Sequence, residues 1–254
     1  MTASAEETPG TGTRSGRPVL PSYTATVVAA FDAEPRMRRI ILSLGQGSGF
    51  TYRPGQAGVM MIPLADGAFG RRDYTIRAAD LDAGTITVDI LKHGETPGPA
   101  WAMATKAGDT IELKGPRGRT VFDATADWHL MTGDETCIPA IAHILETAPK
   151  GSRIHVFVEV SSAKDRLKVE TSADVEIVWI ERNGATAGPS QLMSDAVAAF
   201  DLPAGRGKAY LIGETSNVQL QRRNLVARGM PKVDLLSEGY WRPGRIGGHD
   251  HVDD

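Results

Sequence analysis

The sequence predicts a closed antiparallel β-barrel of six strands, followed by an α/β domain with a parallel sheet. Two observations carry this prediction. Up to about residue 122, short apolar runs are separated by glycine, proline and aspartate turns, with almost no helical pattern between them. After Asp123 the period changes, and apolar strands alternate with helical patterns, as in a parallel sheet that is covered on both faces.

The first half contains the six expected barrel strands, which are bounded by turn signals such as Pro54–Gly55 and Ala83–Gly84. One helical segment, Pro99–Lys106, is expected before the last strand. The strands are expected at Tyr23–Phe31, Met37–Leu44, Ala57–Ile62, Asp73–Ala79, Thr85–Leu91 and Thr110–Lys114.

The second half is expected to alternate four parallel strands with helices. The helices are expected to begin near Ile138, Gly188 and Ser216, with a shorter one near Lys164. The strands are expected at His129–Thr132, Ile154–Val160, Val175–Ile180 and Ala209–Ile212. We therefore divide the chain into a disordered leader of small polar residues (1–18), a barrel domain (19–124), an α/β domain (125–246) and a flexible tail (247–254).

Composition argues against several classes of protein. The net charge of -3 and the pI of about 6.1 argue against a general nucleic-acid binder. No apolar stretch approaches the roughly 20 residues that cross a bilayer, and the N-terminal residues lack the apolar core of a secretory signal. A single cysteine, Cys137, excludes an internal disulfide and a cysteine-ligated iron–sulfur cluster. We expect a cytoplasmic protein without membrane insertion, nucleic-acid partner or metal site, whose redox chemistry comes from an organic cofactor.

The run GDETCIPAIAHILE, residues 133–146, has the pattern of a strand, a tight turn and a helix start. Asp134 or Thr136 can cap the helix, and Pro139 suits its first turn. An α/β domain presents backbone N–H groups to ligands at such a place. The alternative is a well-capped helix with no ligand.

The run RRDYTIR, residues 71–77, lies on an expected barrel strand, where alternate side chains face the same way. Arg72, Tyr74 and Ile76 therefore share one face, and the residues between them share the other. A flavin site needs a cation for the pyrophosphate, an aromatic plane for the isoalloxazine ring and a hydroxyl near the reactive nitrogen. Arginine, tyrosine and threonine supply these groups within four residues. The alternative is an ordinary edge strand with solvated arginines.

The order of several motifs resembles the siderophore-interacting protein family over roughly residues 18 to 245. The barrel half carries Arg36–Arg39, Arg72-x-Tyr74-Thr75-x-Arg77, His93-Gly94, Gly98-Pro99-Ala100-Trp101 and Gly115-Pro116-Arg117-Gly118. The α/β half carries Gly133–Thr136, Pro139–Ile141, Val158–Val160, Val178-Trp179, Gly213-Glu214 and Gly239–Arg242. Members of this family are flavin-containing ferric-siderophore reductases of the ferredoxin reductase superfamily, so the resemblance implies a ferredoxin reductase-like fold.

The resemblance implies that Tyr74 stacks on the isoalloxazine ring, Thr75 bonds near its N5 edge and Arg72 pairs with the pyrophosphate. The loop from His93 to Trp101 would wrap the diphosphate and the ribose. The full cofactor-binding set that it implies is Arg72, Tyr74, Thr75, Ile76, Arg77, Lys92, His93, Gly94, Gly98, Pro99, Ala100, Trp101, Gly133, Asp134, Glu135, Thr136, Gly213, Glu214 and Trp241. Residues 133–136 and 213–214 of this set would face a nicotinamide dinucleotide.

Four features leave alternatives open. Ala100 and Trp101 are adjacent, whereas the family commonly has a longer spacer there. Cys137 replaces a small apolar residue, and it either tunes hydride transfer or is simply buried. Trp241 either caps the flavin or lines the substrate mouth, or else pins the last segment to the barrel. Arg182, which follows an expected strand, either selects a 2′-phosphate or is a solvated loop residue.

The resemblance implies an FAD-dependent ferric-siderophore reductase that takes electrons from NADPH, NADH or reduced ferredoxin. No acid, base or nucleophile of the protein is needed, because the flavin carries the chemistry. Siderophores are often anionic, so a basic substrate mouth is expected at Arg117, Arg119, Arg242 and Arg245. The alternatives are a flavin diaphorase whose acceptor is not iron and a non-catalytic ferric-siderophore carrier that binds no flavin.

Overall fold

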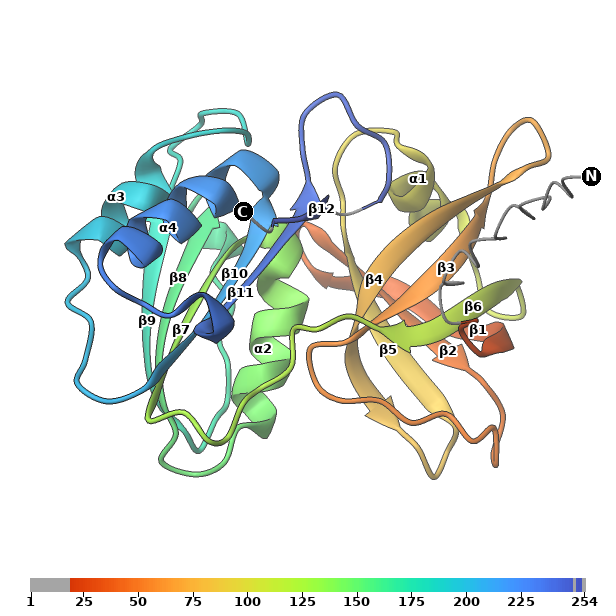
Figure 1. The fold of residues 1–254 in the computed structure, drawn as a ribbon. Helices are drawn as coiled ribbons and strands as arrows, with labels where there is room; N and C mark the ends of the chain where they lie inside the picture. The colour runs from red at the N-terminus through yellow and green to blue at the C-terminus, as the bar shows by residue number, and fades with distance from the viewer. Residues whose placement is uncertain (1–18, 249, 253–254) are drawn as a thin grey trace, which may run out of the picture.

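The structure is a computed structural model that describes residues 19–248 and 250–252 (Figure 1). The expected leader, residues 1–18, lies outside the described residues, as do residue 249 and residues 253–254. The predicted two-part fold is confirmed: a closed barrel is followed by a six-stranded, mostly parallel sheet.

The barrel closes in the strand order β1-β2-β5-β4-β3-β6, with antiparallel neighbours. Its interior is filled by alternate aliphatic side chains, such as Ile40, Leu42 and Ile90, which are almost wholly buried. Burial of each such side chain contributes about 1.5–3 kcal/mol. The barrel elements are β1 (Ser22–Glu34), β2 (Met37–Ser43), β3 (Ala57–Pro63), β4 (Phe69–Asp80), β5 (Thr85–Leu91), α1 (Pro97–Ala104) and β6 (Thr110–Arg117).

The second sheet has the order β12-β11-β10-β7-β8-β9, and all of its strands except β12 run parallel. Its strands are β7 (Trp128–Asp134), β8 (Arg153–Val160), β9 (Asp174–Glu181), β10 (Gly207–Glu214), β11 (Leu235–Trp241) and β12 (Asp250–His251). The intervening helices are η1 (Glu135–Cys137), α2 (Ile138–Thr147), η2 (Ala163–Asp165), α3 (Leu192–Ala199), α4 (Thr215–Ala227) and η3 (Lys232–Asp234). From β7 the chain continues to β8 and β9 on one side, and it then returns to form β10 and β11 on the other side of β7. The topological switch point therefore lies between β7 and β10.

The C-terminal segment differs from the expected flexible tail. Asp250 pairs with Gly239, which makes β12 an antiparallel edge strand beside β11. Val252 is only 5% exposed and packs into the core between the sheet and α3 and α4. The described residues after Trp241, namely 242–248 and 250–252, are called the return segment below. Figure 1 shows the first part of it arching from the sheet toward the barrel.

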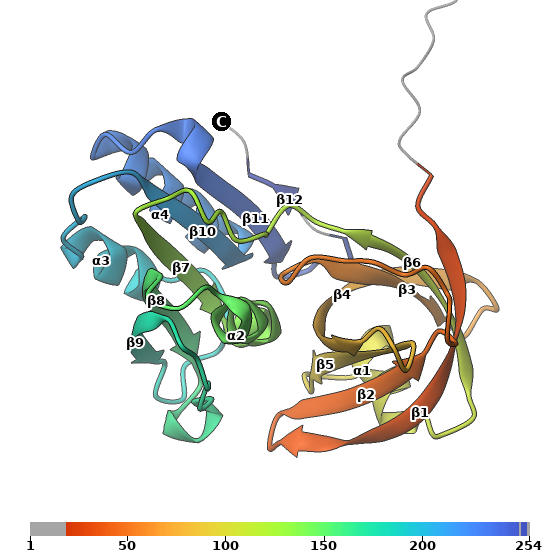
Figure 2. The same cartoon turned by 90° about the horizontal axis from the view of Figure 1, so that it is seen from below.

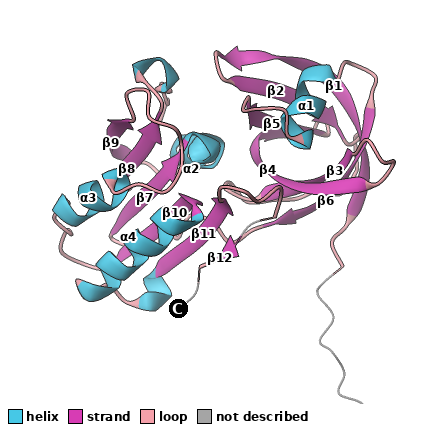
Figure 3. Ribbon diagram, turned by 90° about the horizontal axis from the view of Figure 1, so that it is seen from above, coloured by secondary structure: helices cyan, strands magenta, loops and turns pink. Residues whose placement is uncertain are grey.

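Helix α2 lies between the sheet and the barrel, whereas α3 and α4 cover the other face of the sheet (Figures 2 and 3). Polar contacts fasten α2 to strand β4. Arg77 forms a two-pronged ion pair with Glu146, with both distances 2.6 Å. His143 Nδ1 lies 2.6 Å from the Ile76 carbonyl oxygen and Nε2 lies 3.2 Å from the Tyr52 hydroxyl. These contacts hold β4 against the C-terminal half of α2.

None of the helices formed by the described residues is both long and apolar enough to cross a bilayer.

Candidate functional site

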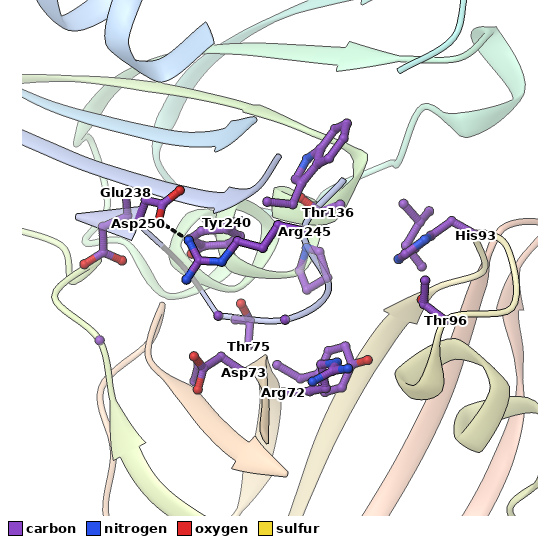
Figure 4. A pocket seen from close by; sticks show the side chains of 18 of the residues that line it. Arg72, Asp73, Thr75, His93, Thr96, Thr136, Glu238, Tyr240, Arg245 and Asp250 are labelled. Carbon is purple, nitrogen blue, oxygen red and sulfur yellow. Dashed lines mark hydrogen bonds and ion pairs between the residues drawn. The ribbon is translucent and has the colours of Figure 1, made fainter. Parts of the chain in front are cut away.

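An open cleft with a cavity volume of about 210 Å3 lies between the barrel and the carboxyl ends of β7 and β11. Strand β4 forms one wall, and the loop that leads into α1 forms another (Figure 4). The turn after β7 and the return segment close the remaining sides. The cleft therefore lies at the carboxyl edge of the α/β sheet, where ligands bind in such domains.

Strand β4 supplies four consecutive lining residues, Arg72 to Thr75. Ile76 does not reach the cleft, because its apolar side chain is wholly buried in the same barrel cluster against which Tyr74 packs. Arg77 does not reach it either, since its guanidinium is directed to Glu146 on α2. Both residues were expected to contact the cofactor, and their side chains lie in the barrel core and against α2, respectively.

Tyr74 lies against the start of α1. A Cβ atom on Gly98 would lie 1.9 Å from the Tyr74 hydroxyl oxygen, so only glycine allows this approach. Burial raises the pKa of Tyr74 to about 12, which keeps its phenol neutral across the physiological range. A neutral aromatic ring at the cleft wall is suited to stacking against a planar ligand.

Arg72 donates from Nη1 to the Arg71 carbonyl oxygen at 2.8 Å, and within the described chain no carboxylate forms an ion pair with it. Nearby, the start of α1 has no side-chain cap in the described structure. Thr96, the residue at that position, lines the same cleft, as does His93. Pro97 and Pro99 have no backbone N–H, and the Ala100 N–H is bonded to the Thr96 carbonyl oxygen. The Arg72 guanidinium is therefore the main donor at this place, with the Gly98 N–H beside it. The residues present therefore fit the phosphates of a flavin dinucleotide.

The other expected residues of this loop lie outside the cleft lining. Lys92 forms an ion pair with Asp32 at 2.9 Å on the barrel surface. Trp101 packs partly buried against the barrel core. Gly94 and Ala100 also lie outside the lining, whereas Pro99 contributes to it.

Asp134 joins the ends of three parallel strands. Its Oδ1 accepts hydrogen bonds from the backbone N–H and the hydroxyl of Thr136, at 2.9 and 2.5 Å. Its Oδ2 accepts from the Glu214 N–H at 3.0 Å and from the indole Nε1 of Trp241 at 2.8 Å. Burial raises the pKa of this carboxyl group, and the hydrogen bonds oppose that rise. Trp241 is thus fixed at the cleft wall by a residue of the neighbouring turn.

Gly133 and Gly213, the two glycines at this edge of the sheet, allow close contacts within the protein. A Cβ on Gly133 would lie 2.6 Å from the Cβ of Cys137, so glycine allows the turn to fold back on β7. Gly213 has a φ of +129°, and a Cβ there would lie 2.9 Å from Asp134 Oδ2. Glu214 caps α4 by accepting from the Asn217 N–H at 2.9 Å. Of the six residues expected to face a dinucleotide here, Thr136 is the one that lines the cleft.

Glu135 lies in a buried ion cluster away from the cleft. Arg182 is 8% exposed and forms ion pairs with Glu135 and with Glu159, the latter at 3.2 Å. Arg36 of the barrel also pairs with Glu135, at 2.8 Å. Neither alternative for Arg182 holds, because the side chain is neither solvated nor exposed to a 2′-phosphate. Cys137 is fully buried, and burial raises the pKa of its thiol well above the ordinary value.

The four arginines expected to form a basic mouth are all paired with carboxylates. Arg117 lies 3.7 Å from Asp73, and Arg119 lies 3.4 Å from Glu238. Arg242 lies 3.8 Å from Asp250, and Arg245 forms a close ion pair with the same carboxylate (Figure 4). Three of these arginines line the cleft, and Arg119 lies just outside its lining.

Several lining residues were not expected from the sequence. Tyr240 packs its buried hydroxyl near Thr75 and Thr120, and burial raises its pKa well above the ordinary value. Glu238 and Asp250 add carboxylates to the mouth. The Gly-Tyr-Trp-Arg run at residues 239–242 marked this strand as part of a motif, but its pairing in the sheet was not predicted.

Comparisons with known proteins match both parts of the chain. Residues 55–120 match the siderophore-interacting FAD-binding domain, and residues 126–244 match the siderophore-interacting protein model. An uncharacterised protein of Mycobacterium tuberculosis is 32% identical over 91% of this chain and 93% of its own length. The ferric vibriobactin reductase ViuB of Vibrio cholerae is 30% identical over 76% of each chain.

Solved structures agree with these matches. A siderophore utilization protein from T. fusca superposes with a TM-score of 0.81 at 29% identity, over 92% of this chain and 97% of that one. Two ferredoxin reductases, at 19% and 15% identity, share the fold alone. On this evidence the chain belongs to the siderophore-interacting protein family and contains its FAD-binding domain.

Proposed function

We propose that this protein is an FAD-dependent ferric-siderophore reductase of the cytoplasm, which releases iron as Fe(II). One observation carries the proposal. Arg72, Tyr74 and Thr75 line a single cleft beside the start of α1, within the stretch that matches the FAD-binding domain. A related protein, ViuB, is named a ferric vibriobactin reductase.

The residues of the cleft would divide the work of holding FAD. Arg72 would hold the diphosphate, because its guanidinium presents N–H donors to anionic oxygens, and the Gly98 N–H at the start of α1 could add one more. Tyr74 would stack on the isoalloxazine ring, and the buried hydroxyl of Thr75 would lie at its edge. Trp241, fixed by Asp134, would exclude water from the opposite side.

The chemistry of the substrate explains why a flavin suits this reaction. Siderophores hold Fe(III), a hard ion, through hard oxygen donors, and such ligands hold Fe(II) much less tightly. FAD accepts electrons in pairs and passes them on singly, which suits an iron centre that takes one. The protein then contributes orientation, exclusion of water and electrostatics, and needs no acid, base or nucleophile of its own.

NADPH, NADH or reduced ferredoxin would supply the electrons. Two features of the α/β edge bear on this choice. The N–H groups of Thr136 and Asn217 at two helix starts are already bonded to the carboxylates of Asp134 and Glu214. A dinucleotide bound there would therefore rely on groups other than these two N–H donors. A ferredoxin that docks on the surface would not need the N–H donors.

A steady-state assay with matched acceptors tests the proposal. Purified protein should be yellow, and with a supplied donor it should reduce ferric siderophores, as measured with a ferrous chelator in excess. A quinone or a dye with the same reduction potential as the ferric siderophore should be reduced more slowly. Fast reduction of the dye alone would favour a general diaphorase. Colourless protein that binds ferric siderophore and not FAD would be a carrier, and either result would contradict the proposal.

A further inference from the structure

Among the described residues, carboxylates offset most of the positive charge of the arginines around the cleft. The four mouth arginines described above face three carboxylates, Asp73, Glu238 and Asp250. Asp89 also lines the cleft and is neutralised by Arg39, two of whose nitrogens each lie 2.7 Å from an oxygen of the carboxylate. The one lining arginine without a described carboxylate partner is Arg72, which the proposed function assigns to the flavin diphosphate.

Asp250 is a fixed member of this set. Its carboxylate pairs with both Arg242 and Arg245 and accepts a hydrogen bond from the Thr215 hydroxyl at 3.1 Å. Its backbone is held in β12 by pairing with β11, and the next apolar residue, Val252, is buried in the α/β core. These tethers prevent the carboxylate from leaving easily when another anion approaches its two arginines.

The cofactor would remove the remaining positive charge. A flavin dinucleotide brings a diphosphate with about two negative charges, the usual charge of such a group at neutral pH. Among the described residues, the diphosphate and the three mouth carboxylates together would cancel the charge of the four mouth arginines and Arg72. The site that receives the acceptor would then have no excess of positive charge, so electrostatic attraction would not favour a highly anionic iron complex.

We propose, on the basis of the proposed function, that the acceptor is a ferric complex without net negative charge, and that Asp250 sets this preference. Each hydroxamate group carries one negative charge, so three of them balance the 3+ charge of Fe(III) and the trishydroxamate centre is neutral. Three catecholate groups carry two each, and their Fe(III) complex is a trianion. A trishydroxamate fits the balanced mouth, whereas a trianion meets the tethered carboxylate of Asp250 at the two arginines that would otherwise bind it.

A matched series of ligands tests charge alone. Ferrioxamine B is a trishydroxamate with a free ammonium group and a charge of about +1. Acetylation of its amine makes the complex neutral, and succinylation gives it about -1, while the iron centre stays the same. Binding of each complex to FAD-loaded and FAD-free protein is measured by tryptophan fluorescence and by calorimetry, without turnover. Asp250→Asn, Asp250→Glu and a control at an exposed site behind the sheet, Asp201→Asn, are compared with the unmodified protein.

The unmodified, FAD-loaded protein should bind the neutral and cationic complexes about 3- to 10-fold more tightly than the succinylated one. Asp250→Asn should tighten binding of the succinylated complex by a similar factor, and added salt should erase that gain. Asp250→Glu and Asp201→Asn should behave like the unmodified protein. Flavin occupancy and melting temperature show whether each variant is folded.

Tightest binding of the succinylated complex by the unmodified protein would overturn the charge proposal while leaving the proposed function intact. Equal effects of Asp250→Asn on all three complexes would overturn the role of Asp250. Protein that binds FAD but no ferric complex of any charge would overturn the proposed function and this inference with it.

Discussion

The indole nitrogen of Trp241 donates a hydrogen bond to the Asp134 carboxylate at 2.8 Å, which joins the end of β11 to the turn after β7. The same carboxylate oxygen accepts from the Glu214 N–H at the end of β10. One buried side chain thus gathers the ends of three parallel strands at the switch point of the sheet. It also sets the position of the aromatic ring that lines the cleft.

Replacing Asp134 by alanine should loosen this junction. Four donor groups, including the Trp241 indole, would lose their acceptor, and the free energy of unfolding should fall by about 1–3 kcal/mol. Urea unfolding measures the loss. Asp134→Asn keeps one carbonyl acceptor and should lose less. If Asp134→Ala is as stable as the unmodified protein, the carboxylate does not hold the junction together.

Substitution of Gly98 should displace Tyr74. In Gly98→Ala the new methyl group would overlap the tyrosine hydroxyl, so the ring must move and FAD affinity should fall by about tenfold or more. Gly188→Ala is the control, because a Cβ there has no neighbour within 4 Å. Adding Tyr74→Phe to Gly98→Ala removes the overlapping oxygen and should restore part of the affinity. Unchanged FAD binding by Gly98→Ala would place the cofactor elsewhere.

Acid should destabilise the α/β domain through His129. This residue is 2% exposed, packs its ring against Phe122, and burial lowers its pKa to about 4. The unfolded chain therefore binds a proton near pH 6.5 that the folded chain binds only near pH 4. Stability should fall as pH drops from 6.5 toward 4, by at most about 3 kcal/mol from this group.

The matched variant is His129→Phe, which keeps an aromatic ring and has nothing to protonate. Its unfolding free energy should depend less on pH between 6.5 and 4 than that of the unmodified protein. Equal slopes for the two proteins would show that other buried groups, such as His143, carry the acid sensitivity; burial lowers the pKa of His143 also.

The sequence predicted the fold well because its signals are local. Each of the six barrel strands was placed within a few residues, and the four parallel strands of the α/β sheet were found, since turn residues and hydrophobic periods mark them. Strand β11 was missed as a strand and β12 was taken for flexible tail. Asp250–His251 is polar and two residues long, so nothing but its pairing with β11 makes it a strand.

The site was harder to predict because its details depend on contacts between distant residues. Residues 72–75 of the motif line the cleft, whereas the side chain of Ile76 is buried in the barrel and that of Arg77 pairs with Glu146. Arg182 belongs to a buried cluster with Glu135, 47 residues away. The carboxylate partners of Arg117 and Arg119 were not predicted either, because Asp73 and Glu238 are distant from them in the sequence. Asp250 was missed as a partner of Arg242 and Arg245 because it was expected to lie in a flexible tail.

The central claim is that a flavin in this cleft delivers electrons to siderophore-bound iron. The most direct measurement is an anaerobic single turnover: the FAD of the purified protein is reduced, excess dithionite is removed, and a neutral ferric trishydroxamate is added with a ferrous chelator. The flavin should be fully reoxidised, with about two Fe(II) trapped per flavin, because each reduced flavin holds two electrons and each iron takes one. A flavin that stays reduced, with no Fe(II) trapped from this complex or from any other ferric siderophore, would contradict the account.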